Sequence, residues 1–141
     1  MKVSKKIEAT PEEFFKLLVT SIEADIKNAD VELPAHGVKS GFSYNKRVSN
    51  RLVAKVTIEE LTEPSTYSAT FLNNRGTNHL KYDIEKIDDQ FINVTVTEDF
   101  KGKKALDDIN QNIMSFVLKR SGSKRTLAIL SMMENYLKEQ K

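Results

Sequence analysis

Residues 52–59 read Leu-Val-Ala-Lys-Val-Thr-Ile-Glu, and their pattern is the clearest indication of the fold class. Apolar side chains stand at every second position, at Leu52, Ala54, Val56 and Ile58. The intervening positions are mostly polar. Because successive side chains of a β-strand point to opposite faces, this period of two predicts a strand with one apolar and one solvated face.

The same period extends outward to cover residues 42–100. Three turn-forming stretches divide it, at 63–65 (Glu-Pro-Ser), 73–76 (Asn-Asn-Arg-Gly) and 88–89 (Asp-Asp). Short turns between strands of alternating polarity are typical of antiparallel hairpins. We therefore predict five consecutive antiparallel strands that share one apolar face.

The residues before this region predict a strand at 3–8 and then a helix over 11–28. Thr10 is a favourable N-cap, Pro11 suits the first helical position, and Glu13 completes a capping box. Apolar residues then recur at steps of three and four, as on one face of a helix.

The residues after the strands predict two further helices. The first covers 103–120, and the sequence Ser-Gly-Ser at 121–123 is expected to end it, since glycine often terminates helices. The last helix carries an apolar stripe of Leu127, Leu130, Met133 and Leu137.

The predicted fold class is α+β, with one domain spanning residues 1–141. The apolar face of the sheet has to be covered, and only the helices at the two ends of the chain are available to cover it. We expect a curved antiparallel sheet of six to seven strands around the last helix, with the first helix closing one end. If the sheet has a seventh strand, we expect it to be short and to lie within 30–41.

This order of elements, together with the sequence Ala-Thr-Pro-Glu-Glu-Phe-Phe at 9–15, resembles the START-like helix-grip superfamily, to which the birch-pollen allergens belong. The resemblance covers nearly the whole chain and implies a sheet that grips a long C-terminal helix, often around a cavity. More narrowly, the chain is similar to a family of small cytosolic proteins from Gram-positive bacteria that has no assigned activity. The predicted helix at 103–120 is an addition to the superfamily pattern, and it could plug or cover such a cavity.

Composition excludes several partners and compartments. Lys and Arg total 22 against 20 for Asp and Glu, and the charges are well mixed, so we expect no nucleic-acid partner. No apolar run approaches the about 20 residues that a membrane-spanning helix needs. With no signal peptide and no cysteine, the cytoplasm is the expected location.

Catalytic, metal and cofactor sites find little support in the sequence. The two histidines, His36 and His79, stand in no known catalytic motif, and we expect neither a metal nor a cofactor. Lys and Arg residues at 119–125 flank the predicted start of the last helix, which favours either an anion site or a solvated turn.

The apolar sheet face is the candidate site for a hydrophobic or amphipathic small molecule, held between the sheet and the last helix. A close-packed core is the alternative. The other functions considered are a protein-interaction or regulatory module, including a homodimer, and an enzyme of the cyclase or hydrolase type, as the superfamily includes. The expected lining residues are Tyr44, Val56, Tyr67, Phe71, Tyr82, Val94, Leu130 and Met133.

Overall fold

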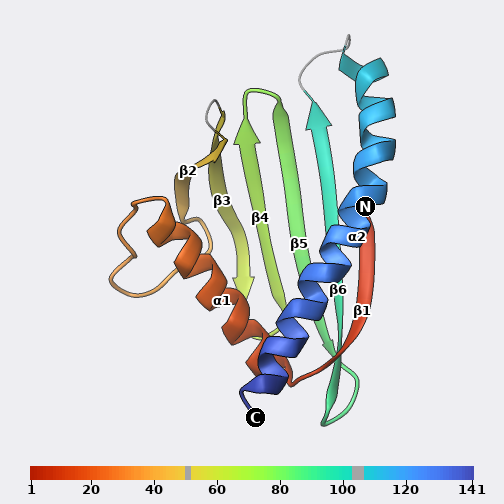
Figure 1. Cartoon of the computed structure of the whole chain (residues 1–141). Helices are drawn as coiled ribbons and strands as arrows, with labels where there is room; N and C mark the ends of the chain where they lie inside the picture. The colour runs from red at the N-terminus through yellow and green to blue at the C-terminus, as the bar shows by residue number, and fades with distance from the viewer. Residues whose placement is uncertain (50–51, 103–106) are drawn as a thin grey trace.

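A curved antiparallel sheet carries two helices on one of its faces in the computed structural model (Figure 1). The structure describes the backbone of residues 1–49, 52–102 and 107–141, and the side chains of 1–47, 52–101 and 123–141. The elements in chain order are β1 (Lys2–Glu8), α1 (Pro11–Asn28), β2 (Ser43–Ser49), β3 (Leu52–Thr62), β4 (Thr66–Asn73), β5 (Gly76–Lys86), β6 (Phe91–Gly102) and α2 (Asp107–Glu139).

The strands lie in the order β1-β6-β5-β4-β3-β2, and every neighbouring pair is antiparallel. The five predicted strands form the consecutive part of this sheet, and β1 adds to its far edge, where Val3 lies opposite Val96. The described residues contain six strands, the lower of the two numbers predicted, and none lies within 30–41. That segment includes Asp30 and Gly37 at positive φ, which is outside the β region.

Helix α1 begins and ends where the sequence predicted, and its start is capped as expected. The Thr10 hydroxyl accepts a hydrogen bond from the backbone N–H of Glu13 at 3.2 Å. Its buried side chains follow the helical period and lie on the sheet: Phe14, Phe15, Leu18, Ile22 and Ile26. Residues at this spacing share one side of a helix, which explains why α1 lies flat on the sheet.

Helix α2 is continuous from Asp107 to Glu139, so the predicted break at 121–123 was wrong. A glycine inside a helix costs only about 0.5–1 kcal/mol relative to alanine, which a long packed helix tolerates. Since no helix starts there, both alternatives given for 119–125, an anion site at a helix start and a solvated turn between helices, lose their basis. The apolar side chains predicted for 103–120 lie outside the described side chains. Over the described residues, neither α1 nor α2 is long and apolar enough to cross a membrane.

The described half of α2 packs on β1 and β6 through one stripe of side chains. Leu130 and Leu137 are buried, Thr126 is buried beside them, and Met133 packs against the same core. Leu127 was predicted to face the sheet but is 39% exposed. Thr126 takes its place, because positions 126, 130, 133 and 137 follow the helical period equally well.

Glu134 fastens α2 to the first strand. Its carboxylate accepts a hydrogen bond from the backbone N–H of Glu8 at 2.7 Å and lies 3.6 Å from the ammonium group of Lys5. The ammonium group of Lys138 lies 3.4 Å from the Glu8 carboxylate. These contacts hold the last helix over the edge of the sheet that the first strand forms.

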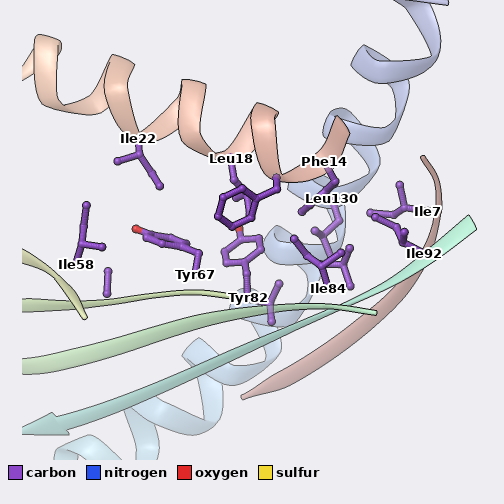
Figure 2. Packing of buried hydrophobic residues seen from close by; sticks show 14 of the residues in the cluster. Ile7, Phe14, Leu18, Ile22, Ile58, Tyr67, Tyr82, Ile84, Ile92 and Leu130 are labelled. Atoms are coloured by element: carbon purple, nitrogen blue, oxygen red, sulfur yellow. The ribbon is translucent and has the colours of Figure 1, made fainter. Parts of the chain in front are cut away.

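The two helices and the sheet share one core, seen from close by in Figure 2. Leu18 of α1 lies over Tyr82, Phe14 lies beside Leu130 of α2, and Leu130 lies near Ile84. The sequence led us to centre the core on the last helix, yet α1 supplies more of the described buried side chains than α2 does. The sheet is therefore covered by both helices rather than by the last one alone.

Two leucines of α2, three residues apart, test this packing. We expect Leu130→Ala to lower the free energy of unfolding by about 2–5 kcal/mol, because the side chain is fully buried. Leu127→Ala, the matched control on the same helix, should change it by no more than about 0.5 kcal/mol. Urea denaturation of both variants measures the difference, and an equal loss for the two would contradict the assigned stripe.

Candidate functional site

The face of the sheet that carries the helices, which we call the inner face, is built from rows of side chains that cross the strands. One row runs through Tyr44, Val56, Phe71, Asn78 and Phe100, each directly opposite the next on the neighbouring strand. Residues directly opposite one another in an antiparallel sheet point to the same face. The row therefore spans β2 to β6 on one side of the sheet.

Two more rows lie parallel to the first. Ile58, Ala69, Leu80 and Glu98 form the next row across β3 to β6. The row after that contains Tyr67 and Tyr82, with Val96 and then Val3 completing it toward β1. The inner face thus presents a regular apolar surface with two polar residues, Asn78 and Glu98, in its midst.

Burial is uneven along the inner face. Tyr67 and Tyr82 are buried, their ring centroids are 6.0 Å apart, and they lie beneath α1 (Figure 2). Phe71 and Leu80 are only partly buried, and Phe100 is 49% exposed. Large apolar side chains left partly uncovered on an otherwise buried face are typical of a surface that contacts a ligand.

We call Phe71, Asn78, Leu80, Glu98 and Phe100 the inner-face patch. Its polar members are joined, since the Asn78 Nδ2 donates a hydrogen bond to the Glu98 Oε1 at 2.8 Å. This bond fixes the orientation of the amide, because the reverse orientation would place Oδ1 against a carboxylate oxygen. The Asn78 Oδ1 is buried and has no hydrogen-bond partner within the described part of the chain.

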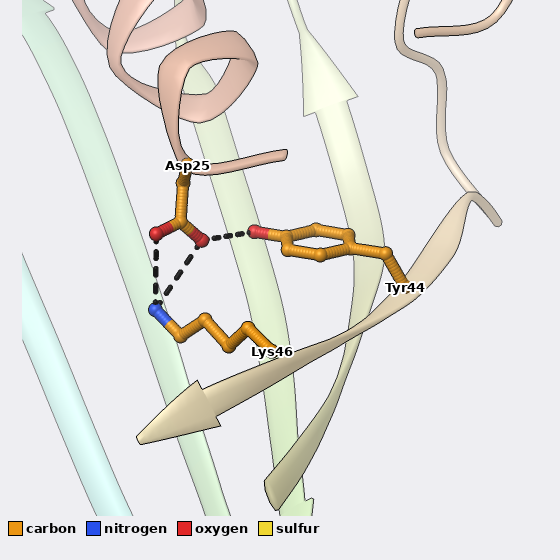
Figure 3. A network of polar contacts seen from close by, with 3 residues as sticks. All are labelled: Asp25, Tyr44 and Lys46. Atoms are coloured by element: carbon orange, nitrogen blue, oxygen red, sulfur yellow. Dashed lines mark hydrogen bonds and ion pairs between the residues drawn. The ribbon is translucent and has the colours of Figure 1, made fainter. Parts of the chain in front are cut away.

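A second polar group lies beside the patch, where α1 meets β2 (Figure 3). The Tyr44 hydroxyl donates to the Asp25 Oδ2 at 2.5 Å, and the Lys46 ammonium lies 3.2 and 3.3 Å from the two oxygens of the same carboxylate. The Lys46 Nζ also lies 5.4 Å from the ring centroid of Phe71. The group ties the end of α1 to the edge strand and borders the patch with a cation.

The environment raises the pKa of three phenols above the ordinary tyrosine value. Burial raises the pKa of Tyr44, and the hydrogen bond to Asp25 raises it further. Burial also raises the pKa of Tyr67 and of Tyr82, with a smaller contribution to Tyr82 from the nearby negative charge of Glu98. At neutral pH these side chains are hydrogen-bond donors rather than bases.

The eight residues proposed from the sequence all belong to the interior between sheet and helices. Tyr44, Val56 and Phe71 share one row, and Tyr67 and Tyr82 share another. The remaining three lie toward β1: Val94 beyond the tyrosine row, and Leu130 and Met133 on α2. Of the eight, Phe71 alone belongs to the inner-face patch.

Sequence reasoning missed four polar residues that point to the interior or its border: Asp25, Lys46, Asn78 and Glu98. The positions of Asn78 and Glu98 in the sequence could have revealed them. Asn78 and Glu98 stand in the apolar register of their strands, two residues from Leu80 and Val96. A polar residue in an apolar register is worth noting, because burying it without a partner costs free energy.

The histidines lie away from the inner face. His79 is exposed and opposite Thr70, whose hydroxyl lies 3.1 Å from its Nδ1. His36 is exposed in the loop before β2, at a hollow of about 320 Å³ whose lining includes Pro34 and Phe42. No three His, Asp or Glu side chains gather to form a metal site among the residues that the structure describes.

Solved structures share the shape of this chain. A START superfamily protein from Mycobacterium smegmatis is 10% identical with a TM-score of 0.62, covering 100% of this chain and 98% of that one. The aromatase/cyclase Zhui from Streptomyces sp. R1128 is 12% identical with a TM-score of 0.60, covering 95% and 92%. DynU16, from the dynemicin biosynthetic locus, is 10% identical with a TM-score of 0.63, and this chain matches over all of its own length but only 48% of that protein.

These similarities concern the fold, because the identities are low. They confirm the predicted START-like helix-grip fold. No curated protein matches the chain in sequence. Residues 1–119 match the family described as "Domain of unknown function (DUF3284)", which is most of the chain. The chain therefore belongs to the DUF3284 family.

Proposed function

We propose that this chain is a cytosolic protein that holds a small hydrophobic or amphipathic molecule between the inner face of its sheet and its helices. The observation that carries the proposal is the incomplete cover of the inner-face patch. Phe71, Leu80 and Phe100 keep part of their apolar surface exposed, whereas the neighbouring tyrosine row is buried. A bound apolar group would remove this surface from water, at about 25 cal/mol for each Å² covered.

Two adjacent residues on opposite faces of β4 test whether the small molecule binds at the inner face. Phe71 points to the inner face, whereas Leu72 is exposed on the outer face. We expect Phe71→Ala to weaken binding of the fluorescent probe 1-N-phenylnaphthylamine about ten-fold, since about 1.4 kcal/mol corresponds to that factor. Leu72→Ala should leave the dissociation constant within about two-fold. Fluorescence titration gives both constants, after circular dichroism has shown that each variant is folded.

The outcomes of this test differ in meaning. Equal effects of the two substitutions would place the probe somewhere other than the inner face. A wild-type protein that binds neither this probe nor any molecule retained through native mass spectrometry would contradict the proposed function.

The buried phenols support a binding role rather than a catalytic one, since acid–base catalysis needs a group whose pKa lies near the working pH. The raised pKa values of Tyr44, Tyr67 and Tyr82 lie further from neutrality than the ordinary value. Both histidines are exposed, and His79 lies on the opposite face of the sheet. An enzyme of the cyclase or hydrolase type is therefore the least supported function.

Alkaline titration tests the state of these phenols. The folded state keeps their protons while the unfolded chain releases them near the ordinary pKa of about 10, so the unfolded state binds fewer protons above that pH. We expect the three phenols to leave stability unchanged below about pH 10 and to lower it progressively above that pH. Ultraviolet absorbance of phenolate should then rise together with loss of circular dichroism. Ionisation of all the tyrosines near pH 10 in a protein that is still folded would contradict the burial.

Self-association is the second candidate function, and one strip on α2 favours it. Ile129, Met132 and Tyr136 lie along one side of the helix at a helical spacing and are 39%, 68% and 51% exposed. Exposed apolar strips of this kind are typical of protein contacts, and a second copy of the chain is the simplest partner.

Sedimentation velocity tests that candidate. If the strip pairs two copies, the wild type sediments as a dimer and the double variant Met132→Glu/Tyr136→Glu as a monomer. Asn135→Glu, which adds a negative charge at an exposed position outside the strip, should remain dimeric. A wild type that stays monomeric at all concentrations tested would exclude self-association.

A further inference from the structure

The inner-face patch has a polar centre whose hydrogen-bonding capacity is unbalanced. Asn78 and Glu98 lie on neighbouring strands, with Leu80 directly opposite Glu98 and Phe71 and Phe100 on either side of Asn78. The pair offers several acceptor positions on the carboxylate and two on the amide oxygen, whereas its donors are the two amide N–H groups, one of which is used in the bond between the two side chains. Counting only the side chains that the structure describes, the patch therefore has more acceptors than donors.

Of the described acceptors in the patch, the Asn78 amide oxygen is the one that most clearly lacks a donor. The Asn78 Oδ1 is buried and unpaired among the described residues, and the Glu98 carboxylate prevents the amide from turning round. An unpaired buried acceptor destabilises the protein, so a ligand group that donates a hydrogen bond to it recovers the lost free energy. A ligand that carries only acceptors would recover none of it.

The charge of the patch points the same way. The Glu98 carboxylate forms no ion pair with a cation of the described residues, although the Met1 ammonium donates to the backbone carbonyl of Glu98 at 2.8 Å. Lys46, which borders the patch, is paired with Asp25 at 3.2 Å. A partly buried carboxylate that has no cation partner in the described part of the chain favours a positively charged ligand and repels an anionic one.

From this arrangement we infer that the occupant of the patch is an amphipathic molecule with a hydrogen-bond-donating head group, and that an ammonium group binds better than a hydroxyl and far better than a carboxylate. The apolar part lies on Phe71, Leu80 and Phe100, and the head group donates to the Asn78 Oδ1 and to the Glu98 carboxylate. This inference rests on the proposed function, which it makes specific as to ligand class.

Three probes with the same ten-carbon chain test the head-group preference: decylammonium, decan-1-ol and decanoate. Calorimetric titration of the full chain at neutral pH should rank their affinities in that order, with decylammonium at least about ten-fold tighter than decanoate. Non-specific electrostatic attraction would give the opposite order, because a protein with a formal net charge of +2 attracts the anion decanoate. It needs no variant and so does not depend on how a substitution folds.

Two matched substitutions locate the effect. Glu98→Gln keeps a hydrogen-bond acceptor for Asn78 but removes the charge, and it should bring the ratio between decylammonium and decanoate close to one. Asp99→Asn removes the same charge from the next residue, which is exposed on the outer face, and should leave the ratio unchanged. Asn78→Leu should weaken decan-1-ol about five-fold by removing the acceptor.

The failures can be told apart. If the wild type binds all three probes equally well, or if Asp99→Asn changes the ratio as much as Glu98→Gln does, the head-group inference is wrong while binding at the inner face stands. If the wild type binds 1-N-phenylnaphthylamine but none of the three probes, the head-group inference is wrong while the proposed function stands. If it binds neither these probes nor 1-N-phenylnaphthylamine and retains no molecule through native mass spectrometry, the proposed function fails and the inference fails with it.

Discussion

The apolar inner face of the sheet determines where both helices must lie. Six strands contribute mostly apolar side chains to this face, and the surface must be covered for the sheet to be stable in water. The cover comes from helices that belong to opposite ends of the chain, α1 directly after the first strand and α2 after the last. Capping by Thr10 and anchoring by Glu134 both act to place these helices on that one face.

Cover of the inner face decreases from the tyrosine row toward Asn78 and Phe100. Beneath α1 the aromatic rings of Tyr67 and Tyr82 pack in a dry interior, whereas two rows further along Phe71 is only partly buried. Polar groups lie where the cover becomes incomplete, with Asp25 and Lys46 on one side and Glu98 on the other. An apolar surface with a few placed polar groups is the composition that small-molecule sites share.

Much of the fold was predictable from the sequence, because local patterns specify its parts. The period of two across residues 52–59 and the cap at Thr10 each depend on neighbouring residues only. The break predicted at 121–123 was wrong because the local preference of Gly122 is weak compared with the stability of a long helix. Leu127 was misplaced since two registers of α2 carry similar apolar patterns, and packing against β1 selects between them. The candidate site was harder to predict, because Asn78 and Glu98 are 20 residues apart and only the pairing of β5 with β6 brings them together.

The pairing of β1 with β6 also governs the order in which the molecule can assemble. Val3 finds its partner at Val96, and Glu8 is bonded to a residue 126 positions further along the chain. During synthesis the first strand leaves the ribosome long before either partner exists, while the hairpins from β2 to β6 can form as they emerge. Such distant pairings slow folding, because the chain loses conformational entropy when the loop between the partners closes, before the contact can offset that loss. Until then the edge of β6 is unpaired, and it could pair with the first strand of a neighbouring nascent chain as readily as with its own.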